Sequence, residues 1–284
     1  MKPITVRFLT IFYLFSVGFF VLGLHSNQQK EKREELGIVL KNCAEYCERL
    51  AHSALFFVCQ EKITEEVVYS RVEMLAKIPQ TFSHAYRSGT KNVYVYDYQL
   101  FRKGDQIKEQ RILIEQNGEK KHEENARLKT KFFTHENLIL GPIALLSSYW
   151  QPHHDYKILK EVKYKGDKTI IIEAVPKPES AIEHLYGKIW VRKSDFSILK
   201  IEWDQKSIGK FEYVEEIAER LKAEPRIVLT AEYGIEKNKI RFLSKFSLDE
   251  IYIIKRRRRR FQRSKTEALY DEYKFFTVET EVKY

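Results

Sequence analysis

The feature of this sequence that most limits its fold is an alternation of apolar and polar residues that recurs in segment after segment. In Asn92 to Arg102, for example, Tyr94, Tyr96, Tyr98 and Leu100 all fall on one face of an extended chain. Successive side chains of a strand point to opposite faces of its sheet, so this pattern predicts strands that are buried on one side and wet on the other. The chain is therefore expected to be mainly β.

Turn residues divide the alternating segments into hairpins. The first expected hairpin joins Asn92–Arg102 to Ile107–Glu115 through Lys103-Gly104-Asp105. The second and third join Tyr156–Lys165 to Lys168–Val175 about Gly166-Asp167, and Gly187–Arg192 to Phe196–Asp204 about Lys193-Ser194-Asp195. A strand at Leu55–Ile63 should precede them, and three segments should complete a C-terminal meander: Pro225–Tyr233, Asn238–Ile253 and Phe261–Tyr284.

One long helix is expected before the strands. Between Glu31 and Ala54 the apolar residues recur at spacings of three and four: Leu36, Val39, Leu40, Cys43, Cys47, Leu50, Ala51 and Ala54. This spacing places them on one face of an amphipathic helix that packs against the rest of the protein.

Two segments depart from the β pattern, Glu65–Arg87 and Leu138–Trp150. The second is too apolar for an ordinary surface loop. Gly141-Pro142 in its middle and Pro152 after its end predict a short helix beginning near Pro142. Because the segment is so interrupted, we expect it to be a lid on an open-sided sheet rather than a principal core element.

The N-terminus has the layout of a secretory signal. Lys2 and Arg7 precede an apolar run from Phe8 to Leu24, and polar residues follow from His25. The run is about 17 residues long, the lower limit for crossing a bilayer, so retention as an inner-membrane anchor by residues 8–24 is the alternative to cleavage near residues 23–26. A single domain over residues 27–284 is expected after the signal, and the mature protein is expected in the periplasm.

Positive charge is concentrated near the C-terminus. The net charge of +10 falls to +8 when Lys2 and Arg7 leave with the signal, and six consecutive cations follow Ile254: Lys255, Arg256, Arg257, Arg258, Arg259 and Arg260. An exported chain does not normally meet nucleic acid, so we expect none as a partner. One interpretation is a charged strand end that resists edge pairing. The other is contact with anionic lipid headgroups or with an envelope membrane protein.

Three cysteines lie close together at Cys43, Cys47 and Cys59. An oxidising compartment permits one disulfide among them. Side chains four apart on a helix have Cβ atoms about 5–6 Å apart, beyond the usual disulfide span. A bridge from Cys47 to Cys59 is therefore expected, with Cys43 to Cys59 as the alternative. Zinc binding is disfavoured because no Cys-x-x-Cys pair is present.

The order of one helix, successive hairpins and a short apolar insert resembles the LolA-like outer-membrane lipoprotein carriers and lipoprotein-sorting proteins. The hairpin Gly187–Glu202, with its Gly-x-hydrophobic-Trp-Val opening, is similar to the central strands of that superfamily, and Tyr270-x-x-Tyr273-x-x-Phe276 is similar to its closing strand. The resemblance implies a mainly β (α+β) fold: a strongly curved antiparallel sheet that forms an unclosed barrel, with an N-terminal helix and a short helical lid.

The resemblance further implies a carrier or chaperone that shields lipoprotein or lipid acyl chains in an apolar cavity. Each methylene buried in such a cavity contributes about 0.8 kcal/mol. The candidate lining residues, each of which could instead fill a dry core, are Tyr94, Tyr96, Tyr98, Ile143, Leu146, Trp190, Ile201, Phe242 and Phe246. A non-enzymatic envelope sensor or binding module of the same fold is the alternative function.

No spaced catalytic signature such as Gly-x-Ser-x-Gly or His-Glu-x-x-His is present, so a secreted enzyme is disfavoured and no cofactor is expected. His153-His154-Asp155 is the sequence feature closest to a metal site. Neighbouring side chains of an extended segment point in opposite directions, so a solvated loop is the expected structure there.

If the apolar run is a cleaved signal, the mature protein lacks everything up to residues 23–26. Intact-mass measurement of exported protein tests this directly. A mass that still includes Met1 or Lys2 would instead identify residues 8–24 as a retained anchor.

Overall fold

The structure is a computed structural model. It describes residues 32–52, 56–69, 89–103, 106–131, 138–180, 185–208, 211–254 and 259–276. Outside this range lie the N-terminal segment, the basic residues 255–258 and the last eight residues. Most of the expected non-β segment after Val68 lies outside it as well.

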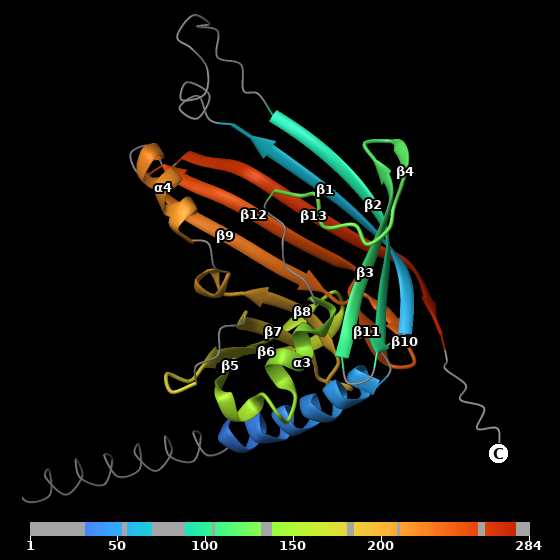
Figure 1. Ribbon diagram of the computed structural model, residues 1–284. Coiled ribbons are helices and arrows are strands. Elements are labelled where there is room, and N and C mark those ends of the chain that lie inside the picture. Colours follow the sequence, from blue (N-terminus) through green and yellow to red (C-terminus); the bar gives the residue numbers. More distant parts are fainter. Residues whose placement is uncertain are drawn as a thin grey trace, which may run out of the picture.

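One antiparallel sheet of eleven strands dominates the fold (Figure 1). Its order is β4-β3-β2-β1-β13-β12-β9-β8-β7-β6-β5, so β4 and β5 are the two edges and the barrel is not closed. In that order the strands are Glu119–Glu123, Gln106–Gln116, Gly89–Lys103, Phe56–Val68, Arg259–Phe275, Lys245–Ile254, Ala223–Glu232, Ile198–Trp203, Gly187–Arg192, Asp167–Pro176 and His154–Tyr164. The fold class that the resemblance implied, an unclosed antiparallel sheet with an N-terminal helix, is confirmed, as is the mainly β structure predicted from the alternation.

The three predicted hairpins are present as β2–β3, β5–β6 and β7–β8. The predicted strand Asn238–Ile253 is wrong, because the chain turns twice there: β10 (Ile235–Lys237) and β11 (Ile240–Phe242) form a separate two-stranded ribbon before β12 begins. Asn238 and Lys239 both have positive φ, which a two-residue turn between tightly paired strands requires.

Sequence reasoning also missed the hairpin that forms the edge of the sheet. Asn117 and Gly118, at φ 52° and 85°, turn β3 into β4. Asn-Gly is the residue pair that tolerates these dihedrals best, so the signal was in the sequence.

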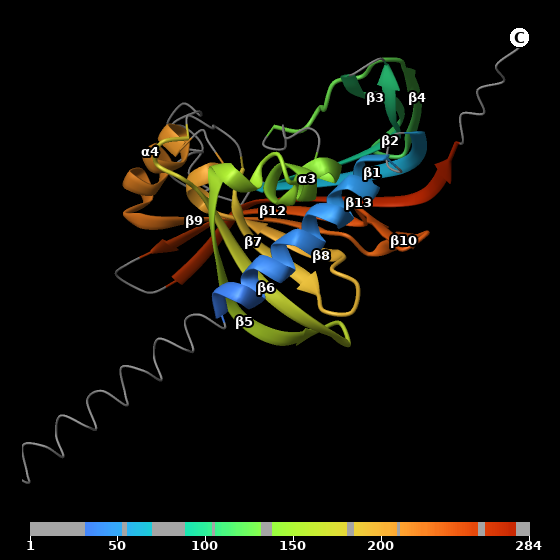
Figure 2. The same ribbon diagram turned by 90° about the horizontal axis from the view of Figure 1, so that it is seen from below.

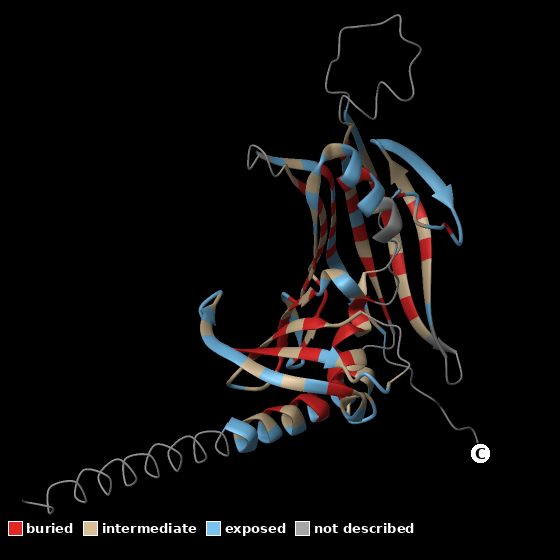
Figure 3. Cartoon of the chain, turned by 90° about the vertical axis from the view of Figure 1, so that its left-hand side faces the viewer, coloured by how far each residue is buried: buried red, intermediate tan, exposed pale blue. Residues whose placement is uncertain are grey.

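The N-terminal helix (residues 32–52) lies across the concave side of the sheet (Figure 2). Its buried face contains the residues that the spacing of three and four predicted, among them Val39, Cys43, Cys47 and Leu50. The outer face remains exposed, as Figure 3 shows. The predicted amphipathic helix is confirmed.

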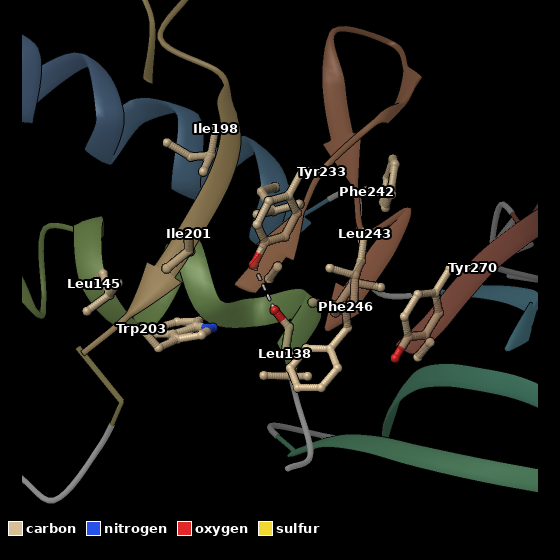
Figure 4. Close-up of a cluster of buried hydrophobic side chains, with 14 of the residues drawn as sticks. Leu138, Leu145, Ile198, Ile201, Trp203, Tyr233, Phe242, Leu243, Phe246 and Tyr270 are labelled. Carbon is tan, nitrogen blue, oxygen red and sulfur yellow. Dashed lines mark hydrogen bonds between the residues drawn. The ribbon is translucent and has the colours of Figure 1, made fainter. Parts of the chain in front are cut away.

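The apolar insert at Leu138–Trp150 forms the 3-10 turn η1 (Leu138–Leu140) and the helix α3 (Gly141–Leu146). The short helix near Pro142 is therefore confirmed, but its expected position as a loose cover is wrong. Leu138, Leu145 and Leu146 are buried in the main core, and the Tyr233 hydroxyl donates to the Leu138 carbonyl at 2.9 Å (Figure 4).

A close backbone approach explains why the insert contains glycine at position 141. A Cβ atom there would lie 2.9 Å from the ring of Trp203 and 3.0 Å from the hydroxyl of Tyr233. Tight packing of this kind between a helix and a sheet is typical of a protein core. The insert is thus a core element held on two sides.

A further helix, α4 (Phe211–Leu221), lies at the other end of the sheet, where sequence reasoning assigned no structure. Ile217 and Ala218 on its inner face pack with Tyr252 of β12 in a small separate cluster. Another 3-10 turn, η3 (Gln205–Ser207), connects β8 to this region, and η2 (Gln151–His153) leads into β5.

The burial of α3 predicts that replacing Leu146 by Ala lowers the free energy of unfolding by about 2–5 kcal/mol, because a fully buried leucine side chain is lost. Urea denaturation followed by circular dichroism measures this change. Leu159→Ala, at a side chain that is 36% exposed on the edge strand β5, is the matched control and should cost far less. Equal effects of the two substitutions would show that α3 is a loose cover after all.

Candidate functional site

Three of the nine predicted lining residues lie in one row across the concave face. Cross-strand partners of an antiparallel sheet share a face, and the pairing connects eight strands in sequence. The row runs through Tyr94, Ile63, Ala268, Phe246, Ala231, Ile201, Ile189 and Ile172. All eight side chains are buried.

The other predicted lining residues are placed differently. Tyr96, Tyr98, Leu146 and Phe242 are also buried in the main core, and Ile143 packs against it half-buried. Trp190 lies on the opposite face of the sheet, because its neighbours Ile189 and Val191 point into the core, and the Lys200 ammonium stands 4.6 Å from its ring centroid. A cavity on the concave face would not include Trp190.

The concave face is filled where these residues lie. The N-terminal helix and α3 cover the row, and Tyr98 borders a void of only 10 Å³ beside Leu138 and Ile139. Such a void has room for about one water molecule. In the described structure these residues therefore form a packed core. That they line a ligand cavity stays a prediction, and it requires the core to open.

The same face contains a buried charged network that sequence reasoning missed. Arg111 makes a two-pronged contact with Glu61, from Nε to Oε2 at 2.6 Å and from Nη2 to Oε1 at 3.2 Å. Glu109 accepts from Arg111 at 3.3 Å and from the Tyr98 hydroxyl at 2.6 Å, while the Tyr270 hydroxyl donates to Glu61 at 2.8 Å. The detectable signal was a glutamate at a core-facing position of an otherwise alternating strand.

Burial alone would lower the pKa of Arg111, but the adjacent carboxylates of Glu61 and Glu109 more than offset this and raise its pKa above the ordinary value. The charges are thus mutually satisfied rather than offered to a ligand. This network joins β1, β2, β3 and β13, and a paired arrangement of this kind fixes geometry more than it adds stability.

An apolar groove remains open on the outside of the core. It has a volume of 370 Å³ and lies between the start of the N-terminal helix and the strands β6 to β8. The apolar residues Ile38, Val39, Ile170 and Phe196 line it together with the charged residues Glu34, Glu35 and Lys193. Ile38 is 60% exposed although it is a large aliphatic residue, so this groove presents apolar surface to solvent.

The predicted disulfide between Cys47 and Cys59 is absent, and all three cysteines, which lie among the described residues, are free and buried. Cys47 is held beneath α3, where its thiol donates to the Pro142 carbonyl at 3.3 Å. Burial raises the pKa of Cys43 to about 12 and raises the pKa of Cys47 and Cys59 as well, which keeps the thiols protonated and inert.

His153-His154-Asp155 is not the solvated loop that we expected. It spans the end of η2 and the start of β5, and His154 is buried, with its Nδ1 3.0 Å from the Trp150 carbonyl. Burial lowers the pKa of His154. Within the described part of the chain no group of His, Cys, Asp and Glu side chains is arranged to hold a metal ion.

Most of the basic run lies outside the described residues. Residues 255–258 are not described, and the side chain of Arg259 is not either, whereas Arg260 is exposed at the start of β13. Among the described residues no helix is long and apolar enough to cross a bilayer. The expected signal or anchor at residues 1–26 also falls outside this range.

Taken as a class, the chain is an open antiparallel half-barrel whose concave face is filled by helices. No protein-family model matches it, and no curated protein does. Several solved structures do. A DUF1329 family protein from Desulfovibrio piger is 12% identical, with a TM-score of 0.41 over 85% of this chain and 95% of that one.

A putative outer membrane lipoprotein-sorting protein domain from Vibrio parahaemolyticus is 13% identical, with a TM-score of 0.42 over 85% and 94% of the two chains. A LolA superfamily protein from Nitrosomonas europaea is 12% identical, with a TM-score of 0.36 over 85% and 96%. These neighbours include the group that the hairpin residues resemble in the sequence.

The Arg111 network predicts that Arg111→Met lowers the free energy of unfolding by about 3–5 kcal/mol, because Glu61 would stay buried as an unpaired charge. Adding Glu61→Gln to that variant should recover part of the loss. Lys121→Met, which removes the exposed pair with Glu119, is the control and should change stability by less than about 1 kcal/mol. Urea denaturation of the four proteins tests this, and equal losses for Arg111→Met and the control would contradict it.

Proposed function

We propose that the protein is a non-catalytic carrier of the cell envelope that shields an apolar chain from water, with lipoprotein or lipid acyl chains as its ligand. The observation that carries the proposal is the open apolar groove beside the N-terminal helix. Its volume of 370 Å³ lies within the range of about 300–1,000 Å³ that small-molecule sites have.

The chemistry of the groove suits an acyl chain. Ile38, Val39, Ile170 and Phe196 offer hydrocarbon on both walls, one from the helix and one from the sheet. Each methylene of a chain that leaves water contributes about 0.8 kcal/mol, so a few of them suffice for binding. Glu34, Glu35 and Lys193, which also line the groove, can contact a polar headgroup.

The groove is also the better-supported location of the ligand. The concave-face residues proposed from the sequence, such as Phe246 and Ile201, are in contact with other core residues and would have to separate from them to admit a ligand. The groove requires no such rearrangement. A ligand that extends from the groove into an opened core would use both sets of residues.

The proposal is tested with a fluorescently labelled palmitate titrated into the full chain. Ile38→Asp should weaken binding about tenfold or more, since about 1.4 kcal/mol of contact is lost and a carboxylate enters the apolar wall. Leu269→Asp is the matched control, because Leu269 is likewise an exposed aliphatic residue, 42% exposed, but lies on β13 away from the groove. The control should bind as the parent does.

Two results would overturn the proposal: no saturable binding of the labelled palmitate to the parent protein, or equal weakening by the two substitutions. Native mass spectrometry of protein purified from an envelope fraction distinguishes the carrier from the alternative function, a non-enzymatic sensor or binding module. A carrier should co-purify with lipid, whereas a sensor module that acts through a protein partner should not.

A further inference from the structure

An exposed aromatic turn follows α3. The rings of Tyr149, Trp150 and His153 lie together there, with centroids 5.0 Å apart for Tyr149 and Trp150 and 5.8 Å apart for Trp150 and His153. Tyr149 is 72% exposed, the largest fraction among the exposed large hydrophobic side chains of the described residues. The ring of Tyr149 therefore does little for the core.

The backbone of this turn is fixed by several hydrogen bonds. The Ser147 carbonyl accepts from the backbone nitrogens of Trp150 and Gln151, both at 3.0 Å. The Gln151 side chain donates to the carbonyls of Leu40 and Leu146, both at 2.8 Å. The turn is thus attached both to α3 and to the N-terminal helix. The exposed ring of Tyr149 packs on the half-buried rings of Trp150 and His153 on this support.

Rigid presentation of exposed aromatic rings is characteristic of a binding surface. Ordering a side chain on binding costs about 0.5–1.5 kcal/mol, and a rigid turn avoids part of that cost. Tyrosine and tryptophan combine an apolar ring with one polar atom, which is why they are enriched where a bilayer meets water.

The choice of a bilayer as the occupant rests on retention of residues 8–24 as an anchor, the alternative to cleavage of the signal. The turn is tied to the N-terminal helix at Leu40, and that helix is described from residue 32 onward. Residue 32 follows Leu24, the end of the apolar run, by eight positions. Eight residues span at most about 28 Å, so any membrane that holds the run lies within that distance of the helix start.

We propose that the aromatic turn at residues 149–153 is a docking surface for the interface of a phospholipid bilayer. The exposed charges at the helix start are mixed, with Lys32 and Arg33 beside Glu34, so zwitterionic lipid should suffice and anionic lipid should not be required. The inference does not depend on the carrier function.

Brominated lipid tests the surface, because bromine quenches tryptophan emission on contact. The full chain is mixed with vesicles of phosphatidylcholine, with or without bromine on the acyl chains. Emission should fall with the brominated lipid by the share that Trp150 contributes, and Trp150→Phe should abolish the fall. Trp190→Phe, on the opposite face of the sheet beside Lys200, is the control and should leave the fall in place.

Tyr149→Ser gives a second readout that does not alter the core, since its side chain is exposed. It should reduce the quenching while circular dichroism stays unchanged. Absence of quenching in the parent protein would overturn the proposal, as would quenching that survives Trp150→Phe. Loss of palmitate binding in Ile38→Asp with quenching retained would separate this surface from the acyl-chain groove.

Discussion

Covering the apolar row on the concave face is the constraint on which the rest of this structure depends. The sheet is open, so its inner face is not closed off by other strands, and a row from Tyr94 through Phe246 to Ile172 would otherwise meet water. The N-terminal helix and α3 supply the cover. The hydrophobic effect drives this arrangement because each large side chain that is fully buried contributes about 1.5–3 kcal/mol.

The placement of the insert follows from that constraint. A helix as short as α3 has little stability of its own, so its position is set by what it contacts: Trp203 and Tyr233 around Gly141, and the Cys47 thiol beneath Pro142. The same contacts bury Cys47, which is a free thiol that donates to the Pro142 carbonyl.

Because helices fill the concave face, the groove and the aromatic turn lie outside the core. The groove beside Ile38 and the aromatic turn at Tyr149 both adjoin the N-terminal helix, whereas the strand edges are protected differently. Every residue of the edge strand β4 is exposed and charged or polar, and charged side chains at an edge oppose pairing with another chain. The groove and the aromatic turn thus both lie beside the helix that follows the apolar run in the sequence.

The sequence by itself determined the three predicted hairpins and the amphipathic helix, since side-chain periodicity and turn residues act over a few neighbouring positions. The unclosed sheet was expected only from the resemblance to the LolA-like superfamily. The sequence also contained the Asn117-Gly118 turn, a local signal. Tertiary structure alone decided that Trp190 points away from Ile201, that Glu61 meets Arg111 fifty positions later, and that the leucines of the insert are buried in the main core. Those outcomes depend on strand register and on contacts between distant segments, and a residue's type does not specify the partner that it will meet.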